Sequence, residues 1–137
     1  MVEPAEFPGD SPTPAQGEGF DVSVVWHYRV VVLKVAGTLD MVSAPQLSES
    51  ILTAMTNEPA GIIADLSEVE FLASAGMTVL IAANEEVSRS ARFGVVADGP
   101  ATSRPMKLVG VDDMITIYPT IEAALEDLQR VTGNRNT

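Results

Sequence analysis

The sequence of 137 residues contains no cysteine, which excludes disulfides, thiol chemistry and metal sites held by cysteine. Only 5% of the residues are aromatic, so the core has to be built from aliphatic side chains. Basic residues are also few, eight against 19 acidic ones, and the net charge is −11. An excess of negative charge this large argues against binding to nucleic acid or to an anionic membrane surface.

Long hydrophobic runs are missing as well. The apolar stretches are interrupted by charge or glycine within about ten residues, whereas a membrane-spanning helix needs about twenty. The first residues are acidic, unlike the basic start of a signal peptide. We therefore expect a cytoplasmic protein without a membrane anchor.

The chain is long enough for one domain. Residues 1–19 are rich in proline, glycine and acidic residues, a composition that favours a disordered arm. We expect a single domain over residues 20–131 and a short flexible tail over residues 132–137.

Two Val-rich strands at the start of this domain are followed by alternating helical and strand patterns. Expected strands cover 21–26, 29–36, 62–66, 93–97 and 115–118, and expected helices cover 44–55, 74–91, 103–109 and 121–131. The sequence Ser43-Ala44-Pro45-Gln46 matches a capping box at the start of the first helix. This order predicts an α/β fold: a mixed sheet of about five strands, with three to four helices mainly on one face.

One segment near the middle of the chain points to regulation. The strand at 62–66 runs into polar residues, which we interpret as a turn at Ser67–Glu70, and Ser74 then stands where the next helix begins. The N–H groups at a helix N-terminus bind phosphate oxygens, so a serine there is a good site for a charge switch. The simpler reading is that Ser74 only caps the helix.

The sequence lacks the combinations of residues that are typical of a catalytic site. Ser74 lies in Ala-Ser-Ala-Gly rather than Gly-x-Ser-x-Gly, and neither a Walker loop nor Gly-x-Gly-x-x-Gly occurs. The single histidine, His27, falls in the expected turn between the first two strands. We expect no catalytic residue, no cofactor and no metal site.

Two blocks of sequence resemble a known family. Gly37-Thr38-Leu39-Asp40 follows an apolar strand and is similar to the family pattern Gly-Glu-Leu-Asp. Residues 65–76 resemble its second block, Asp-Leu-Ser, a spacer and then Phe-Met/Leu-Asp-Ser-Ser/Thr-Gly. Both blocks belong to the STAS domain of bacterial anti-sigma factor antagonists, and the resemblance covers roughly residues 20–131.

The resemblance implies a partner switch in transcription. The unmodified antagonist would bind an anti-sigma factor, a serine kinase of histidine-kinase-like ATPase fold, and release a sigma factor. Phosphorylation of the family's serine, here Ser74, would end binding, and a phosphatase would reset it. This chain departs from the family in having Ala73 for the aspartate before that serine, Ala75 for the second hydroxyl residue and Thr38 for glutamate.

The carboxyl ends of parallel strands meet at one edge of a sheet, so Asp40 and Ser74 should share that edge. The expected partner-binding residues are Thr38, Asp40, Ser43, Ser74, Ala75, Gly76 and Thr78. Asp40 has the alternative role of stabilising its own loop. Two other functions stay open: a STAS-type interaction module without phosphorylation, and a sensor of a small ligand such as a nucleotide or lipid.

Overall fold

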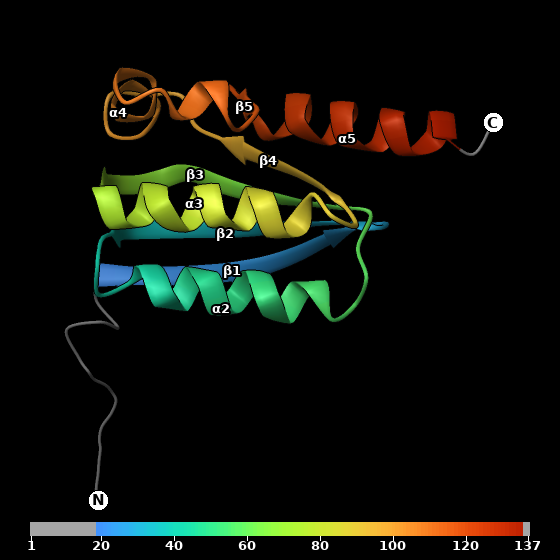
Figure 1. Cartoon of the computed structure of the whole chain (residues 1–137), viewed down its shortest axis with the longest axis horizontal. Helices are drawn as coiled ribbons and strands as arrows, with labels where there is room; N and C mark the ends of the chain where they lie inside the picture. The colour runs from blue at the N-terminus through green and yellow to red at the C-terminus, as the bar shows by residue number, and fades with distance from the viewer. Residues whose placement is uncertain (1–18, 136–137) are drawn as a thin grey trace, which may run out of the picture.

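The computed structural model describes the backbone of residues 19–135 and the side chains of residues 19–129. Apart from Gly19, the acidic arm expected at the N-terminus lies outside the described residues. Five strands form one sheet in the order β1-β2-β3-β4-β5 (Figure 1). The strands are β1 (Phe20–His27), β2 (Val30–Leu39), β3 (Gly61–Leu72), β4 (Arg92–Val96) and β5 (Ile117–Tyr118). Strand β1 pairs antiparallel with β2, and all other neighbours are parallel, so the predicted mixed sheet is confirmed.

Helices cover both faces of this sheet. They are α2 (Ala44–Met55), α3 (Ser74–Val87), α4 (Ser103–Leu108), a short 3₁₀ turn (Val111–Asp113) and α5 (Ile121–Arg135). The bounds of α2 are those predicted, while α5 runs four residues further than predicted.

Two separate cores result from the alternation of side chains along the strands. Leu33 and Ile62 point to one face and join the larger core with the inner sides of α2 and α3. Val32 and Ile63 point to the other face and pack with Leu128 of α5. The helices are thus mainly on one face, as expected, with α5 as the exception that closes the other.

Strands β2 and β3 both extend further than predicted. Gly37 does not end β2 but lies within it with a φ of +98°, and Ser67–Glu70 belongs to β3 rather than to a turn. The register between the two strands shifts twice, between Lys34 and Ala36 and between Gly37 and Thr38. Bulges of this kind let a strand continue where the simple apolar pattern stops, which is why the sequence pattern understated both strands.

The first hairpin also differs from expectation by one residue. Its turn is Tyr28-Arg29, not His27-Tyr28, because His27 pairs with Val30 in the ladder. Tyr28 has a φ of 58° and its side chain is 94% exposed.

Candidate partner-binding edge

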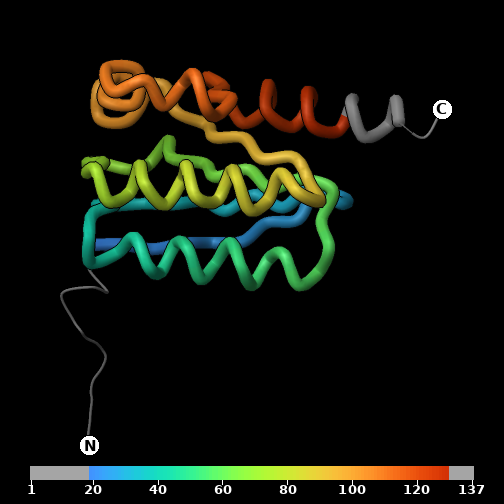
Figure 2. The backbone as a smooth tube through the Cα atoms, in the orientation of Figure 1, coloured from blue at the N-terminus to red at the C-terminus, as the bar shows by residue number. Residues whose placement is uncertain are grey.

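The carboxyl ends of β2 and β3 lie side by side at one edge of the sheet. Leu39 at the end of β2 is in register with Leu72 at the end of β3. The backbone N–H of Ala73 donates to the carbonyl oxygen of Leu39 over 2.9 Å, which joins the two exits directly. Figure 2 shows the first turns of α2 and α3 at this same end of the molecule. Asp40 and Ser74 therefore share one edge, as the sequence predicted.

The loop from β2 into α2 is organised by the Asp40 carboxylate. Its Oδ1 accepts hydrogen bonds from the N–H of Val42 at 3.0 Å and of Ser43 at 3.1 Å. The Ser43 N–H is the main reason that the pKa of Asp40 lies below its ordinary value. Desolvation opposes this shift, and the Val42 N–H and Ser43 hydroxyl add to it. These bonds support the loop-stabilising role of Asp40.

Ser43 is buried and holds the same loop from inside, so the predicted capping box is wrong. Its hydroxyl makes no capping bond to α2. Instead Ser43 Oγ donates to the carbonyl oxygen of Thr38 at 2.7 Å and accepts from the N–H of Asp40 at 2.9 Å. A hydroxyl bonded to two backbone groups holds the shape of this edge.

The residues that lead into α3 have no comparable set of side-chain hydrogen bonds. The N-cap position is Ala73, in an extended conformation, and no side chain bonds to the helix N-terminus. The first turn holds no acidic residue. Ser74 is the first helical residue and is exposed, so the reading of this serine as the cap is wrong. One turn later, the exposed Thr78 donates its hydroxyl proton to the Ser74 carbonyl oxygen at 3.1 Å.

Gly76 faces the core rather than the solvent. It is buried, and a Cβ atom at this position would lie 2.7 Å from Leu39 Cγ and 2.9 Å from Leu72 Cδ1. The glycine therefore lets α3 approach the ends of β2 and β3 closely, while Ala75 beside it is half-buried. Because Gly76 is buried, the residues around it separate it from the surface that a partner would contact.

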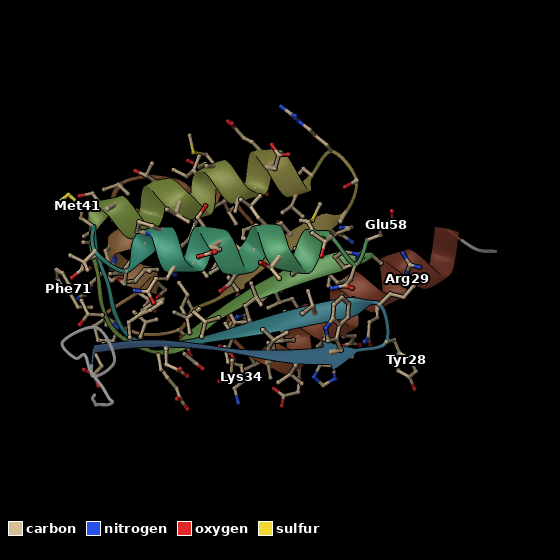
Figure 3. All side chains as sticks on the ribbon, turned by 90° about the horizontal axis from the view of Figure 1, so that it is seen from below. Tyr28, Arg29, Lys34, Met41, Glu58 and Phe71 are labelled. Atoms are coloured by element: carbon tan, nitrogen blue, oxygen red, sulfur yellow. The ribbon has the colours of Figure 1, made fainter. Side chains whose placement is uncertain are left out.

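Three exposed apolar side chains at this edge escaped the sequence analysis. Met41 is 77% exposed, Val42 71% and Phe71 57%. Met41 and Val42 belong to the Asp40 loop, Phe71 precedes the turn into α3, and Figure 3 places Met41 and Phe71 at the same end of the molecule. Two consecutive apolar residues directly after Asp40, within a loop, were the available signal. An apolar group of this kind is typical of a protein-binding surface.

Other kinds of site find little support in the described part of the chain. Within it, His, Asp and Glu side chains form no group of three or more that can hold a metal ion. None of its helices combines the length and the apolar character that crossing a membrane requires.

Comparison with known proteins identifies the family of this domain. The sequence-family model described as the STAS domain matches residues 21–124. The chain belongs to the STAS-domain family of anti-sigma factor antagonists. It is 38% identical over 108 residues to the anti-sigma-F factor antagonist RsfB of Mycobacterium tuberculosis, a match that covers 79% of this chain and 88% of that protein.

Solved structures of the family have the same fold. The crystal structure of an anti-sigma factor antagonist from Mycobacterium paratuberculosis superposes with a TM-score of 0.78 at 39% identity, over 85% of this chain and 99% of the other. The antagonist SpoIIAA in its unphosphorylated form has a TM-score of 0.66 at 22% identity, over 82% and 97% of the two chains. At that identity the likeness to SpoIIAA shows the shared fold alone.

Proposed function

We propose that this STAS protein binds an anti-sigma factor and thereby frees a sigma factor, and that phosphorylation of Ser74 ends the binding. The observation that carries the proposal is the exposed Ser74 at an uncapped helix N-terminus, beside the apolar residues Met41, Val42 and Phe71. The name of the relative from Mycobacterium tuberculosis supports the partner class.

The partner surface consists of residues at and after the carboxyl ends of β2 and β3. Met41, Val42 and Phe71 supply apolar area, and Ser74 and Thr78 supply exposed hydroxyl groups along the first turns of α3. Buried apolar side chains near the centre of an interface carry much of its affinity. Thr38, Asp40 and Ser43 hold the loop that presents Met41 and Val42, and Gly76 sets the position of α3.

The enzyme that modifies Ser74 is proposed to be the anti-sigma factor itself, acting as a serine kinase of histidine-kinase-like ATPase fold. A phosphatase would restore the free serine. A phosphate on Ser74 adds about −1.5 to −2 charges and meets the positive end of the α3 dipole. Because the first turn of α3 holds no carboxylate, the phosphate is well accommodated by this domain. Within the interface, however, the same charge has to be desolvated.

Binding is tested by titration calorimetry with the anti-sigma factor encoded in the same genome. Met41→Asp introduces a charge into the proposed surface and should weaken binding at least tenfold. Leu52→Asp is the matched control, because Leu52 is an exposed apolar residue of α2 outside the surface. Equal affinity of the two variants, with circular dichroism showing both folded, would place the interface elsewhere.

Phosphorylation is tested by mass spectrometry after incubation with the anti-sigma factor and ATP. We expect one phosphate on the wild-type protein and on Thr78→Ala, and none on Ser74→Ala. A phosphate that persists in Ser74→Ala would assign the modification to another residue.

A second candidate function is a STAS interaction module that binds its partner without phosphorylation. The observation that favours it is the pair of alanines, Ala73 and Ala75, on either side of Ser74. Binding of the anti-sigma factor without any phosphate on the wild-type protein would support this second function.

A further inference from the structure

Among the described residues, 19–135, no strand pairs with the outer side of β1, which is therefore an edge of the sheet. It stands at one end of the strand order, and its eight residues pair with β2 in one continuous register without a bulge. The strand contains neither lysine nor proline, the residues that usually protect an exposed edge from pairing. An unprotected edge of this length is suited to pair with another strand.

Apolar side chains project from β1 on both faces. Val24 is 54% exposed, Val25 39% and Trp26 42%, in a chain that has only one tryptophan. Val22, Val24 and Trp26 line a groove of about 490 Å³ between β1 and α2. The exposed apolar area thus lies beside unpaired backbone groups, which together favour strand addition.

We propose that β1 pairs antiparallel with β1 of a second copy of this chain, so that two sheets join into one of ten strands. The occupant is a second copy because the strand is complementary to itself. With Val24 opposite Val24 of the second copy, Asp21 lies opposite His27 of that copy, and Val22 lies opposite Trp26 of that copy. The imidazole offers an N–H to the carboxylate, and no two carboxylates face each other.

Symmetry limits the choice of register. A two-fold axis perpendicular to the sheet keeps each side chain on its own face, so paired residues have to share a face. The axis therefore passes through the middle of a pair formed by the same residue of the two copies, and not between two pairs. The hairpin adds a second condition. His27 pairs with Val30 next to a two-residue turn and forms a hydrogen-bonded pair with it. The backbone N–H and C=O groups of the odd-numbered residues of β1 are therefore bonded to β2. The backbone groups of Val22, Val24 and Trp26 are then directed outward. The register centred on Val24 satisfies both conditions.

Carboxylates near β1 are Glu49 of α2, which lines the groove, and Glu68 and Glu70 of β3, which line a second hollow with Asp21. Along β1 the only charged or titratable side chains are Asp21 and His27. Lys34 of the neighbouring strand β2 is in register with Ser23 and adds one positive charge on the Asp21 face. Within the strand itself a second copy brings Asp21 opposite His27, so the acidic groups that oppose pairing lie on α2 and β3 and not in the paired strands.

The absence of cysteine allows a direct test by disulfide formation. Paired residues across an antiparallel ladder have Cα atoms about 4.5–5.5 Å apart, which suits a disulfide. Val24→Cys should form a covalent dimer under mild oxidant. Tyr28→Cys is the control: Tyr28 is the more exposed residue, yet in this register the two copies of Tyr28 lie about 27 Å apart, eight residues at 3.4 Å each. Equal cross-linking of the two variants would indicate random collision and overturn the proposal.

Sedimentation velocity of the full chain gives the second measurement. The wild-type protein should sediment at twice its 14.5 kDa mass. Val24→Lys should return it to the monomer, because two lysines would then face each other on the axis, while Leu52→Lys should leave the dimer intact. A monomeric wild-type protein, or a dimer that withstands Val24→Lys, would overturn the proposal.

Discussion

Two helices begin at the same edge of the sheet, but the segments that lead into them are built differently. The loop before α2 is held by Asp40 and Ser43, which together engage the backbone at Thr38, Asp40, Val42 and Ser43. The start of α3 has Ala73 at the capping position and no side-chain bond. Neither helix has a side-chain cap, but the loop that leads into α2 is held by its own side chains, whereas no side-chain hydrogen bond of the described residues holds the residue before α3. The difference matches the proposed division between a presenting loop and a switch.

The largest effect should come from placing a permanent charge at the open start of α3. Ser74→Glu is expected to weaken binding of the anti-sigma factor by about 3 kcal/mol, a factor of more than about a hundred, because the carboxylate has to be desolvated in the interface. Ser74→Gln is the neutral control of similar size. Titration calorimetry that finds the same loss for both variants would mean that bulk, and not charge, controls binding.

Filling the contact below α3 should cost stability. Gly76→Val places a Cβ atom and two methyl groups against Leu39 and Leu72, and overpacking of this kind costs about 1–3 kcal/mol. Ala75→Val, at the half-buried neighbour, is the control for the lower helix propensity of valine. The free energy of unfolding from urea titration should fall more for Gly76→Val. An equal change in both variants would show that the close approach at Gly76 is not limiting.

Capping the start of α3 should stabilise the domain. Ala73→Asp is expected to stabilise the domain by about 1 kcal/mol, because Ala73 already has the extended conformation of an N-cap and aspartate is a preferred residue there. Any stabilisation by Ser74→Glu should shrink in the Ala73→Asp background, since an anion then already occupies the helix start. Additive effects of the two substitutions would contradict this.

The smallest effect concerns the loop before α2, held by Asp40, and the dependence of stability on pH. The pKa of Asp40 is lowered in the folded protein, so its contribution to stability is fully present above its unfolded pKa of about 3.9 and is lost as the pH falls through the folded value. Asp40→Asn should therefore be less stable than wild type at pH 7, and the gap should close as the pH falls below about 4. A gap that does not change with pH would rule out the charge of Asp40 as the cause.

Parts of this edge followed from the sequence because they depend on local chemistry. The start of α2 was predicted from Ser43 and Pro45, and the shared position of Asp40 and Ser74 followed from the geometry of parallel strands. The role of Ser43 did not follow, because its hydroxyl bonds backward to Thr38 rather than forward to the helix. The sequence pattern alone does not distinguish the two directions.

Other features depend on tertiary structure and left no clear local signal. The face that α5 covers could not be predicted from its own residues, since an amphipathic helix fits either side of a sheet. The exposure of Met41, Val42 and Phe71 was missed because apolar residues are assigned to the core by default. Buried Gly76 was expected at the partner surface, although its size serves the contact with Leu39 and Leu72.

The two register shifts between β2 and β3 have a consequence for the alignment of this edge. From the first pair, Val30 with Gly61, to the last, Leu39 with Leu72, β2 advances nine residues and β3 advances eleven. The bulges take up the two extra residues, and the strands therefore finish level. Deleting one residue from the bulged part of β3 would displace one exit against the other by about 3.3 Å, enough to break the bond from Ala73 to Leu39. The alignment of the Asp40 loop with Ser74 is thus a matter of strand length, and an insertion or deletion in either strand would disturb it more than many substitutions at the surface.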